Sequence, residues 1–110
     1  MTKSILITGA AGTVGETIGR YLKDQGHEVI GVGLDECDEM CYTRIHSIDL
    51  TEEENIGRLE DLLEKVDAVL HLAWNLSEEN FDTGKKWEGN MDMFHNVLKA
   101  SKNNVDIFIN

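Results

Sequence analysis

The sequence predicts an α/β fold built on a parallel sheet, and three observations lead to this prediction. Five short apolar runs alternate with segments whose apolar residues recur at helical spacing, which is the pattern of repeated β-α units. A glycine-rich turn joins the first run to the first helical segment. The chain has 110 residues, 41% of them hydrophobic and 28% charged, so we expect one domain with a modest core.

The first β-α unit is the clearest. The run SILIT predicts a buried strand from Ser4 to Thr8, and a helix is expected from Thr13 to Gln25. One apolar stripe of this helix recurs every four residues and should face the sheet: Val14, Ile18 and Leu22. Gly26 follows the helix and predicts its end, because a glycine just past the last turn is common there.

The remaining elements follow the same alternation. Strands are expected at residues 28–33, 44–48, 68–72 and 105–109. A helix from Thr51 to Lys65 begins with a possible capping box, Thr51 with Glu54. Its apolar residues fall on one face: Ile56, Leu59, Leu63 and Val66. A last helix, from about Trp87 to Lys102, carries Met91, Phe94 and Leu98 at helical spacing.

The glycine turn has a chemistry of its own. A strand that turns sharply into a helix needs positions that tolerate positive φ and a backbone that a ligand can approach, and Gly9, Gly12 and Gly15 supply these. The first turn of the helix adds unpaired N–H groups and the positive end of the helix dipole. We therefore expect the turn to bind a pyrophosphate; the alternative is a βα turn that binds nothing.

The spacing of this turn resembles that of a known family. TGAAGTVG, from Thr8 to Gly15, matches the TGxxGxxG motif of the extended short-chain dehydrogenase/reductase proteins, also called the NAD-dependent epimerase/dehydratase family. Further segments resemble family motifs in the right order: Asp49-Leu50, HLAW at residues 71–74, and GNMDMFHNVLKAS at residues 89–101. The resemblance implies a three-layer Rossmann-type doubly wound sheet with strand order 3-2-1-4-5. It implies that residues 1–110 are the N-terminal NAD(P)-binding part of a truncated family fold.

The resemblance also implies where a dinucleotide would bind. In the family, the Asp-hydrophobic pair holds the adenine, the motif after the fourth strand lies beside the cofactor, and the Asn of the next helix props the site. The positions expected to bind the cofactor are Gly9, Ala11, Gly12, Thr13, Val14, Gly15, Asp35, Asp49, Leu50, Leu72, Ala73, Trp74 and Asn90. Taken singly, Asp49 could be a solvated acid, His71 a packed core histidine, and Asn90 an ordinary polar residue near a helix start.

The residues after the second strand favour NAD over NADP. The family commonly has an acid at the position of Gly33, where this chain departs from the pattern. However, Asp35 follows two residues later, Glu36, Asp38 and Glu39 come after it, and no Lys or Arg occurs between Lys23 and Arg44. An additional phosphate would therefore meet a negative field.

The family's catalytic residues are not found in these 110 residues. The family uses a Ser or Thr after the fifth strand and a Tyr-x-x-x-Lys pair, but neither Tyr21 nor Tyr42 has a Lys four residues on. We expect the chain to be the NAD-binding part of an oxidoreductase or epimerase/dehydratase that acts on a sugar or nucleotide-sugar. The loop with Ser77 most resembles the uronate dehydrogenase-like branch. The alternatives are a non-catalytic dinucleotide-binding module or redox sensor, and, disfavoured by the glycine turn, a flavodoxin-like domain.

Charge and composition exclude other classes. The net charge of −11 disfavours nucleic acid and anionic membranes as partners and is compatible with a salt-loving host. The chain has no apolar run of membrane-spanning length and no secretion signal, so a cytoplasmic protein is expected. Cys37 and Cys41 are expected to be free thiols, with no metal site. Self-association is expected through the 87–102 helix.

Overall fold

The computed structural model describes residues 2–74, 85–102 and 104–110, and Ser77 lies outside them. Its elements, in chain order, are β1 Ser4–Thr8, α1 Thr13–Asp24, β2 Glu28–Gly33, η1 Glu39–Cys41, β3 Arg44–Ser47, η2 Glu53–Asn55, α2 Ile56–Leu63, β4 Ala68–His71, α3 Lys85–Ser101 and β5 Ile107–Ile109. The two η elements are single turns of 3₁₀-helix.

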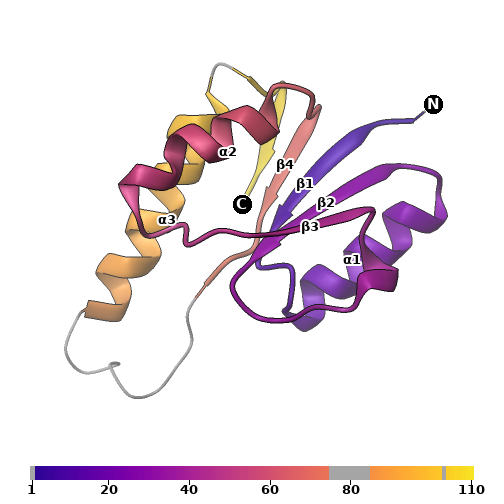
Figure 1. The fold of residues 1–110 in the computed structure, drawn as a ribbon, viewed down its shortest axis with the longest axis horizontal. Helices are drawn as coiled ribbons and strands as arrows, with labels where there is room; N and C mark the ends of the chain where they lie inside the picture. The colour runs from indigo at the N-terminus through magenta and orange to yellow at the C-terminus, as the bar shows by residue number, and fades with distance from the viewer. Residues whose placement is uncertain (1, 75–84, 103) are drawn as a thin grey trace.

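The five strands form one parallel sheet in the order β3-β2-β1-β4-β5. Helix α1 covers one face, and α2 and α3 cover the other (Figure 1). The predicted α/β class, the three layers and the strand order are therefore confirmed. Parallel strands need crossover connections, which is why each β-α unit places its helix on a face of the sheet.

The α2/α3 face holds the larger core. It is built from branched aliphatic side chains of the central strands and of the two helices, and we call it the aliphatic face. Its buried members are Leu6, Ile30, Val32, Ile48, Leu50, Ile56, Leu59, Leu63, Val66, Val69, Val97 and Ala100. The predicted apolar positions of α2 belong to this set, which explains why a helix of only eight residues is stable there.

The α1 face holds a smaller core. Its buried members are Ile7, Ala10, Val29, Cys41 and Tyr42. The predicted stripe of α1 is wrong at its first position, because Val14 is 59% exposed at the start of the helix, whereas Ile18 and Leu22 pack against this core. The helix residues buried against the sheet side are instead two glycines, Gly15 and Gly19.

The predicted capping box of the second helix is also wrong. Helix α2 begins at Ile56, five residues after Thr51, and η2 precedes it. Asp49 Oδ1 accepts hydrogen bonds from the Thr51 amide at 3.0 Å and from its hydroxyl at 2.6 Å. The Thr51 side chain therefore closes a turn with Asp49 and does not cap the helix.

The last helix and strand lie at one edge of the sheet. Helix α3 buries Val97 and Ala100 against the sheet, Leu98 is 40% exposed, and Phe94 packs inward with its ring 6.0 Å from that of Phe108. Ile107 and Ile109 of β5 are each 53% exposed. Within the described ranges, no helix is long and apolar enough to cross a membrane.

Candidate functional site

The glycine turn is tight, and its backbone is hydrogen-bonded to β2. Gly9 has a φ of +72°, a conformation that favours glycine, and its carbonyl accepts from the Gly12 amide at 3.1 Å. The Ala10 amide donates to the Val32 carbonyl of β2 at 3.2 Å. The turn is thus fastened to the neighbouring strand through its own backbone.

The same turn meets the end of β4 without side chains between them. A Cβ built at Gly9 would lie 2.8 Å from the Ala73 nitrogen and from the Leu72 carbonyl carbon. Inside the turn, a Cβ at Gly15 would lie 2.5 Å from the Gly9 oxygen. Glycine is therefore required at both positions. The structure brings Leu72 and Ala73, two of the positions expected to bind the cofactor, beside the turn.

The start of α1 leaves backbone donors open. The first hydrogen bond of the helix runs from the Glu16 amide to the Gly12 carbonyl at 2.9 Å, and the N-cap Gly12 offers no side chain. In the described part of the chain, no acceptor takes the amides of Ala11, Thr13, Val14 or Gly15. Unpaired donors at the positive end of a helix dipole are suited to bind a phosphate.

Thr8 joins β1 to the end of β4. Its buried Oγ1 accepts from the Leu72 amide at 3.0 Å and the Ala73 amide at 3.1 Å, and it lies 2.8 Å from His71 Nδ1. Because two amides already donate to Oγ1, the hydroxyl proton points at Nδ1, and the imidazole hydrogen is on Nε2.

This arrangement makes His71 a packed core histidine, one of the two possibilities left open for it. Only 3% of its surface is exposed, and its ring stacks on Phe108 with the centroids 6.4 Å apart. Burial lowers the pKa of His71, which favours the neutral ring. Its buried Nε2 has no hydrogen-bond partner among the described residues.

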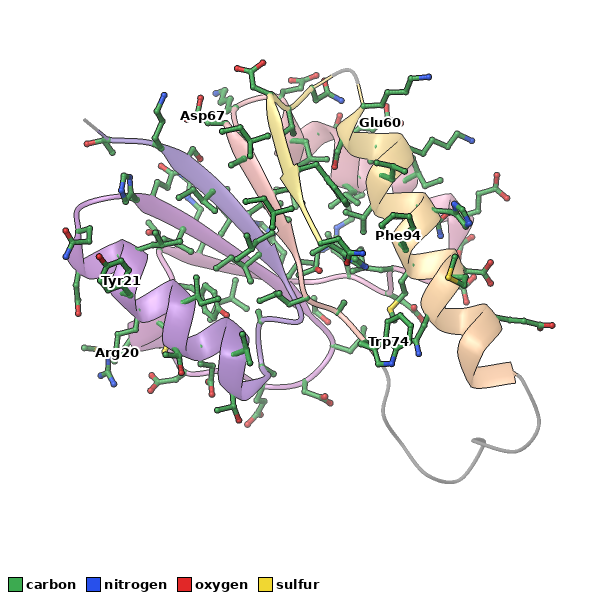
Figure 2. The ribbon with its side chains drawn as sticks, turned by 180° about the vertical axis from the view of Figure 1, so that it is seen from behind. Arg20, Tyr21, Glu60, Asp67, Trp74 and Phe94 are labelled. Atoms are coloured by element: carbon green, nitrogen blue, oxygen red, sulfur yellow. The ribbon has the colours of Figure 1, made fainter. Side chains whose placement is uncertain are left out.

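Two more predicted positions, Trp74 after β4 and Asn90 on α3, differ in their exposure to solvent. Trp74, 47% exposed, follows β4 at the opposite end of the strand from Asp67 (Figure 2). Asn90 is 1% exposed on α3. The carboxyl end of β4, which adjoins the glycine turn, therefore presents an exposed indole.

The Asp49-Leu50 pair is tied into the fold. The Asp49 carboxylate binds Thr51, as described above, and its carbonyl accepts from Asn55 Nδ2 at 2.9 Å. Leu50 is 5% exposed within the aliphatic face, and its carbonyl accepts from Asn96 Nδ2 of α3 at 2.8 Å. The pair lies just after β3, two strands away from β1, and no hydrogen bond joins it to the turn in the part of the chain described.

The acidic segment after β2 is partly used by the protein itself. Asp38 Oδ1 caps η1 by accepting from the Met40 amide at 2.9 Å, and the Asp38 amide donates to Glu16 Oε2 at 2.8 Å. Asp35 and Glu36 are exposed directly after β2. Position 33 lies beside the turn, because a Cβ at Gly33 would be 3.6 Å from the Ala10 nitrogen.

Sequence reasoning missed Tyr42. Its ring is 2% exposed on the α1 face, and its hydroxyl donates to the Ala10 carbonyl of the turn at 2.7 Å. Burial raises the pKa of Tyr42 well above its ordinary value of 10.0, so the hydroxyl stays protonated and remains a donor. The signal was present in the glycines of α1 and β2, which leave room for one bulky ring.

Cys37 and Cys41 are free thiols. No group of three or more His, Cys, Asp or Glu side chains suited to a metal ion occurs in the described ranges.

Comparison with known proteins identifies a family whose model matches nearly the whole chain. Residues 5–110 match the model of the NAD dependent epimerase/dehydratase family. No curated protein matched the chain.

Three solved structures illustrate the likeness. A UDP-glucose-4-epimerase from Stenotrophomonas maltophila, solved with bound NAD and formylated UDP-arabinopyranose, shares 24% identity over 96% of this chain and 35% of its own, with a TM-score of 0.80. A Thermotoga maritima UDP-glucose 4-epimerase with UDP-glucose shares 25% identity over 96% and 36%, with a TM-score of 0.78. An epimerase from Methanothermobacter thermautotrophicus shares 28% identity over 97% and 34%, with a TM-score of 0.76. The chain therefore spans about a third of these proteins.

Proposed function

The chain belongs to the NAD dependent epimerase/dehydratase family, and on this premise we propose that it binds NAD as part of an oxidoreductase or epimerase/dehydratase. The substrate of the whole protein is a sugar or nucleotide-sugar, and the reaction is hydride transfer between that substrate and the nicotinamide. NAD supplies the hydride acceptor, and the residues described above bind and orient it. No acid/base pair for the reaction is assigned to this chain.

One observation carries the proposal. The glycine turn places four amides without an acceptor among the described residues, those of Ala11, Thr13, Val14 and Gly15, at the carboxyl end of the central strand β1. Ligands of open parallel sheets bind outside the carboxyl ends of the strands, where the order reverses. In this sheet β1 lies between β2 and β4, so the turn stands at that reversal.

The other predicted positions are proposed to flank the dinucleotide. Leu72 and Ala73 adjoin the turn through backbone contact, and Trp74 and Asn90 extend this side of the site. Asp49 and Leu50 are proposed on the adenine side, where their fixed turn keeps the backbone rigid.

NAD is proposed over NADP because of charge. Asp35 and Glu36 are exposed after β2, and no Lys or Arg occurs at residues 24–43. A 2′-phosphate placed there would be repelled, whereas ribose hydroxyls can donate to a carboxylate.

The sugar substrate is proposed from the family and from one neighbour. The Thermotoga maritima epimerase was solved with UDP-glucose and is 25% identical to this chain. The uronate dehydrogenase-like branch remains a prediction.

Calorimetric titration of the protein with NAD and with NADP tests the proposal. Gly12 has an extended backbone, with φ −74°, and its added Cβ would meet only the Gly9 oxygen, at 3.4 Å. Gly12→Val should therefore fold but obstruct the phosphate seat, weakening NAD binding by about tenfold or more, equivalent to about 1.4 kcal/mol. Gly57→Ala is the matched control, because nothing lies within 4 Å of its added Cβ. Unchanged binding by Gly12→Val, or tighter binding of NADP, would contradict the corresponding part of the proposal.

Two further proposals concern the surroundings of the protein. We propose that copies associate along α3, where Leu98 is exposed; a monomeric mass in sedimentation would contradict this.

We also propose that the protein works in the cytoplasm of a salt-loving host, because its net charge is −11. Unfolding that is no more resistant in molar KCl than in dilute buffer would contradict this second proposal.

A further inference from the structure

The Tyr42 side chain occupies space that three neighbouring glycines leave open because they carry no side chain. Added Cβ atoms would lie 2.9 Å from Tyr42 Cδ1 at Gly31, 2.8 Å from its Cε1 at Gly19 and 3.2 Å from its hydroxyl at Gly15. We call these three glycines the glycine slot. They come from α1 and β2, so the ring lies between helix and sheet, with its hydroxyl end toward the turn.

The segment that carries Tyr42 is fastened along α1 at both ends. Near the start of the helix, the Asp38 amide donates to Glu16 Oε2 at 2.8 Å. Near its end, Lys23 Nζ donates to the Tyr42 carbonyl at 3.2 Å. With its backbone held and its ring enclosed, Tyr42 has one position for its hydroxyl.

That position fixes the peptide between Ala10 and Ala11. The Tyr42 hydroxyl donates to the Ala10 carbonyl at 2.7 Å, while the Ala10 amide is held by Val32. The described chain contains no cis peptide bond. In a planar trans peptide, the C=O and the following N–H point in opposite directions. The Ala11 amide therefore points away from Tyr42.

We propose that Tyr42 is a positioning residue of the dinucleotide site: its hydroxyl holds the Ala10 carbonyl and so aims the Ala11 amide at the bound pyrophosphate. The Ala11 amide has no acceptor among the described residues, and its nitrogen lies 3.9 Å from the Cβ position of Gly33, at the carboxyl end of β2. It is thus an open donor at the crevice where the cofactor is proposed to bind. The proposal rests on the proposed function for its ligand, but the orientation of the peptide is a property of the free protein.

Removing the hydroxyl alone tests the proposal. Tyr42→Phe keeps the ring in the glycine slot, so the fold should remain, but the buried Ala10 carbonyl loses its donor and the peptide can rotate. We expect NAD binding to weaken about two- to twelvefold, since a hydrogen bond contributes about 0.5–1.5 kcal/mol. Tyr21→Phe is the matched control, because Tyr21 is 63% exposed on α1.

A second readout separates positioning from general stability. The Ala11 amide should shift in the NMR spectrum of free Tyr42→Phe but not of free Tyr21→Phe. Replacing Tyr42 with para-aminophenylalanine, which also donates a hydrogen bond, should restore both the amide shift and the affinity. Unchanged affinity in a folded Tyr42→Phe variant would overturn the proposal, as would an unshifted Ala11 amide.

The outcomes also distinguish this inference from the proposed function. If the wild-type protein binds no NAD by calorimetry, the proposed function fails, and the proposal that Tyr42 aims the Ala11 amide at a pyrophosphate fails with it. In that case an Ala11 shift in Tyr42→Phe would show peptide orientation alone. If the wild type binds NAD but the cofactor does not protect the Ala11 amide from hydrogen exchange, the inference fails and the proposed function stands. This last measurement needs no variant, so it can overturn the inference even if Tyr42→Phe does not fold.

Discussion

The two faces of the sheet are packed by different means. The aliphatic face fills the space under α2 and α3 with branched side chains such as Leu59, Leu63 and Val69, each 1% exposed or less. The α1 face uses the glycine slot and one tyrosine, so that helix, strand and turn approach one another closely. The first face contributes buried apolar area, which stabilises the fold. The second gives up part of that area and in return fixes the backbone atoms of the candidate site.

The largest expected effect comes from the aliphatic face. Leu59→Ala removes a side chain that is 1% exposed and should lower the free energy of unfolding by about 2–5 kcal/mol, measured by urea denaturation. The NAD affinity of the protein that remains folded should be unchanged, because Leu59 lies on the far side of the sheet from Tyr42. Leu34→Ala, at a residue that is 64% exposed, is the control. If Leu59→Ala also weakened NAD binding, the two faces would not act separately on stability and on binding.

A substitution in the glycine slot should lower the free energy of unfolding less than Leu59→Ala does, but it should weaken NAD binding more. A Cβ at Gly19 would lie 2.8 Å from Tyr42 Cε1 and 2.8 Å from the Cys41 carbonyl oxygen. Gly19→Ala should therefore cost about 1–3 kcal/mol of unfolding free energy, although alanine is the better helix former. Because the ring must shift, calorimetry should also show weaker NAD binding.

The control for this substitution is on the other face. Gly57→Ala on α2 meets nothing within 4 Å and should stabilise the helix by up to about 1 kcal/mol. If Gly19→Ala behaved like Gly57→Ala in both stability and binding, the slot would not constrain the ring.

The smallest expected effect is a pH dependence of the free energy of unfolding, which we attribute to His71 of β4. Burial holds the pKa of His71 below its ordinary value of 6.5 in the folded protein, whereas the unfolded chain titrates near that value. Below pH 6.5 the unfolded state therefore takes up a proton that the folded state does not. The free energy of unfolding should fall as the pH drops from 6.5 toward the folded pKa and should keep its full value above 6.5.

Urea denaturation at several pH values measures this slope. His71→Gln should reduce it, and His95→Gln, at an exposed residue of α3, should leave it unchanged. An equal slope in the wild type and in His71→Gln would mean that another group is responsible.

Much of this architecture follows from local patterns. The strands and helices, and the strand order implied by the family resemblance, were predicted. These succeed because apolar periodicity reports burial directly and because the glycine spacing is a specific motif. The apolar residues of α2 were right even though its start was wrong, because packing is encoded by spacing whereas the first turn depends on local hydrogen bonds.

The errors have different physical origins. Thr51 could cap a helix, but its hydroxyl donates to Asp49 in a local turn, and α2 begins only at Ile56. Val14 has the right spacing, but it lies in the first turn of α1, where it is 59% exposed. The contact between Tyr42 and Ala10 joins residues 32 apart in the chain. No periodicity within a single helix or strand specifies such a pair.

The hydrogen bond between Thr8 and His71 has a consequence for biosynthesis. It joins residues 63 apart, and β1 needs both β2 and β4 as neighbours. At a translation rate of about 5–20 residues per second, about 3–13 seconds separate the synthesis of its two ends. During that interval the Ile5-Leu6-Ile7 run of the nascent chain lacks β4, and it is then a ready site for a chaperone or for misfolding. Slowing of the ribosome between β1 and β4 would lengthen this exposure.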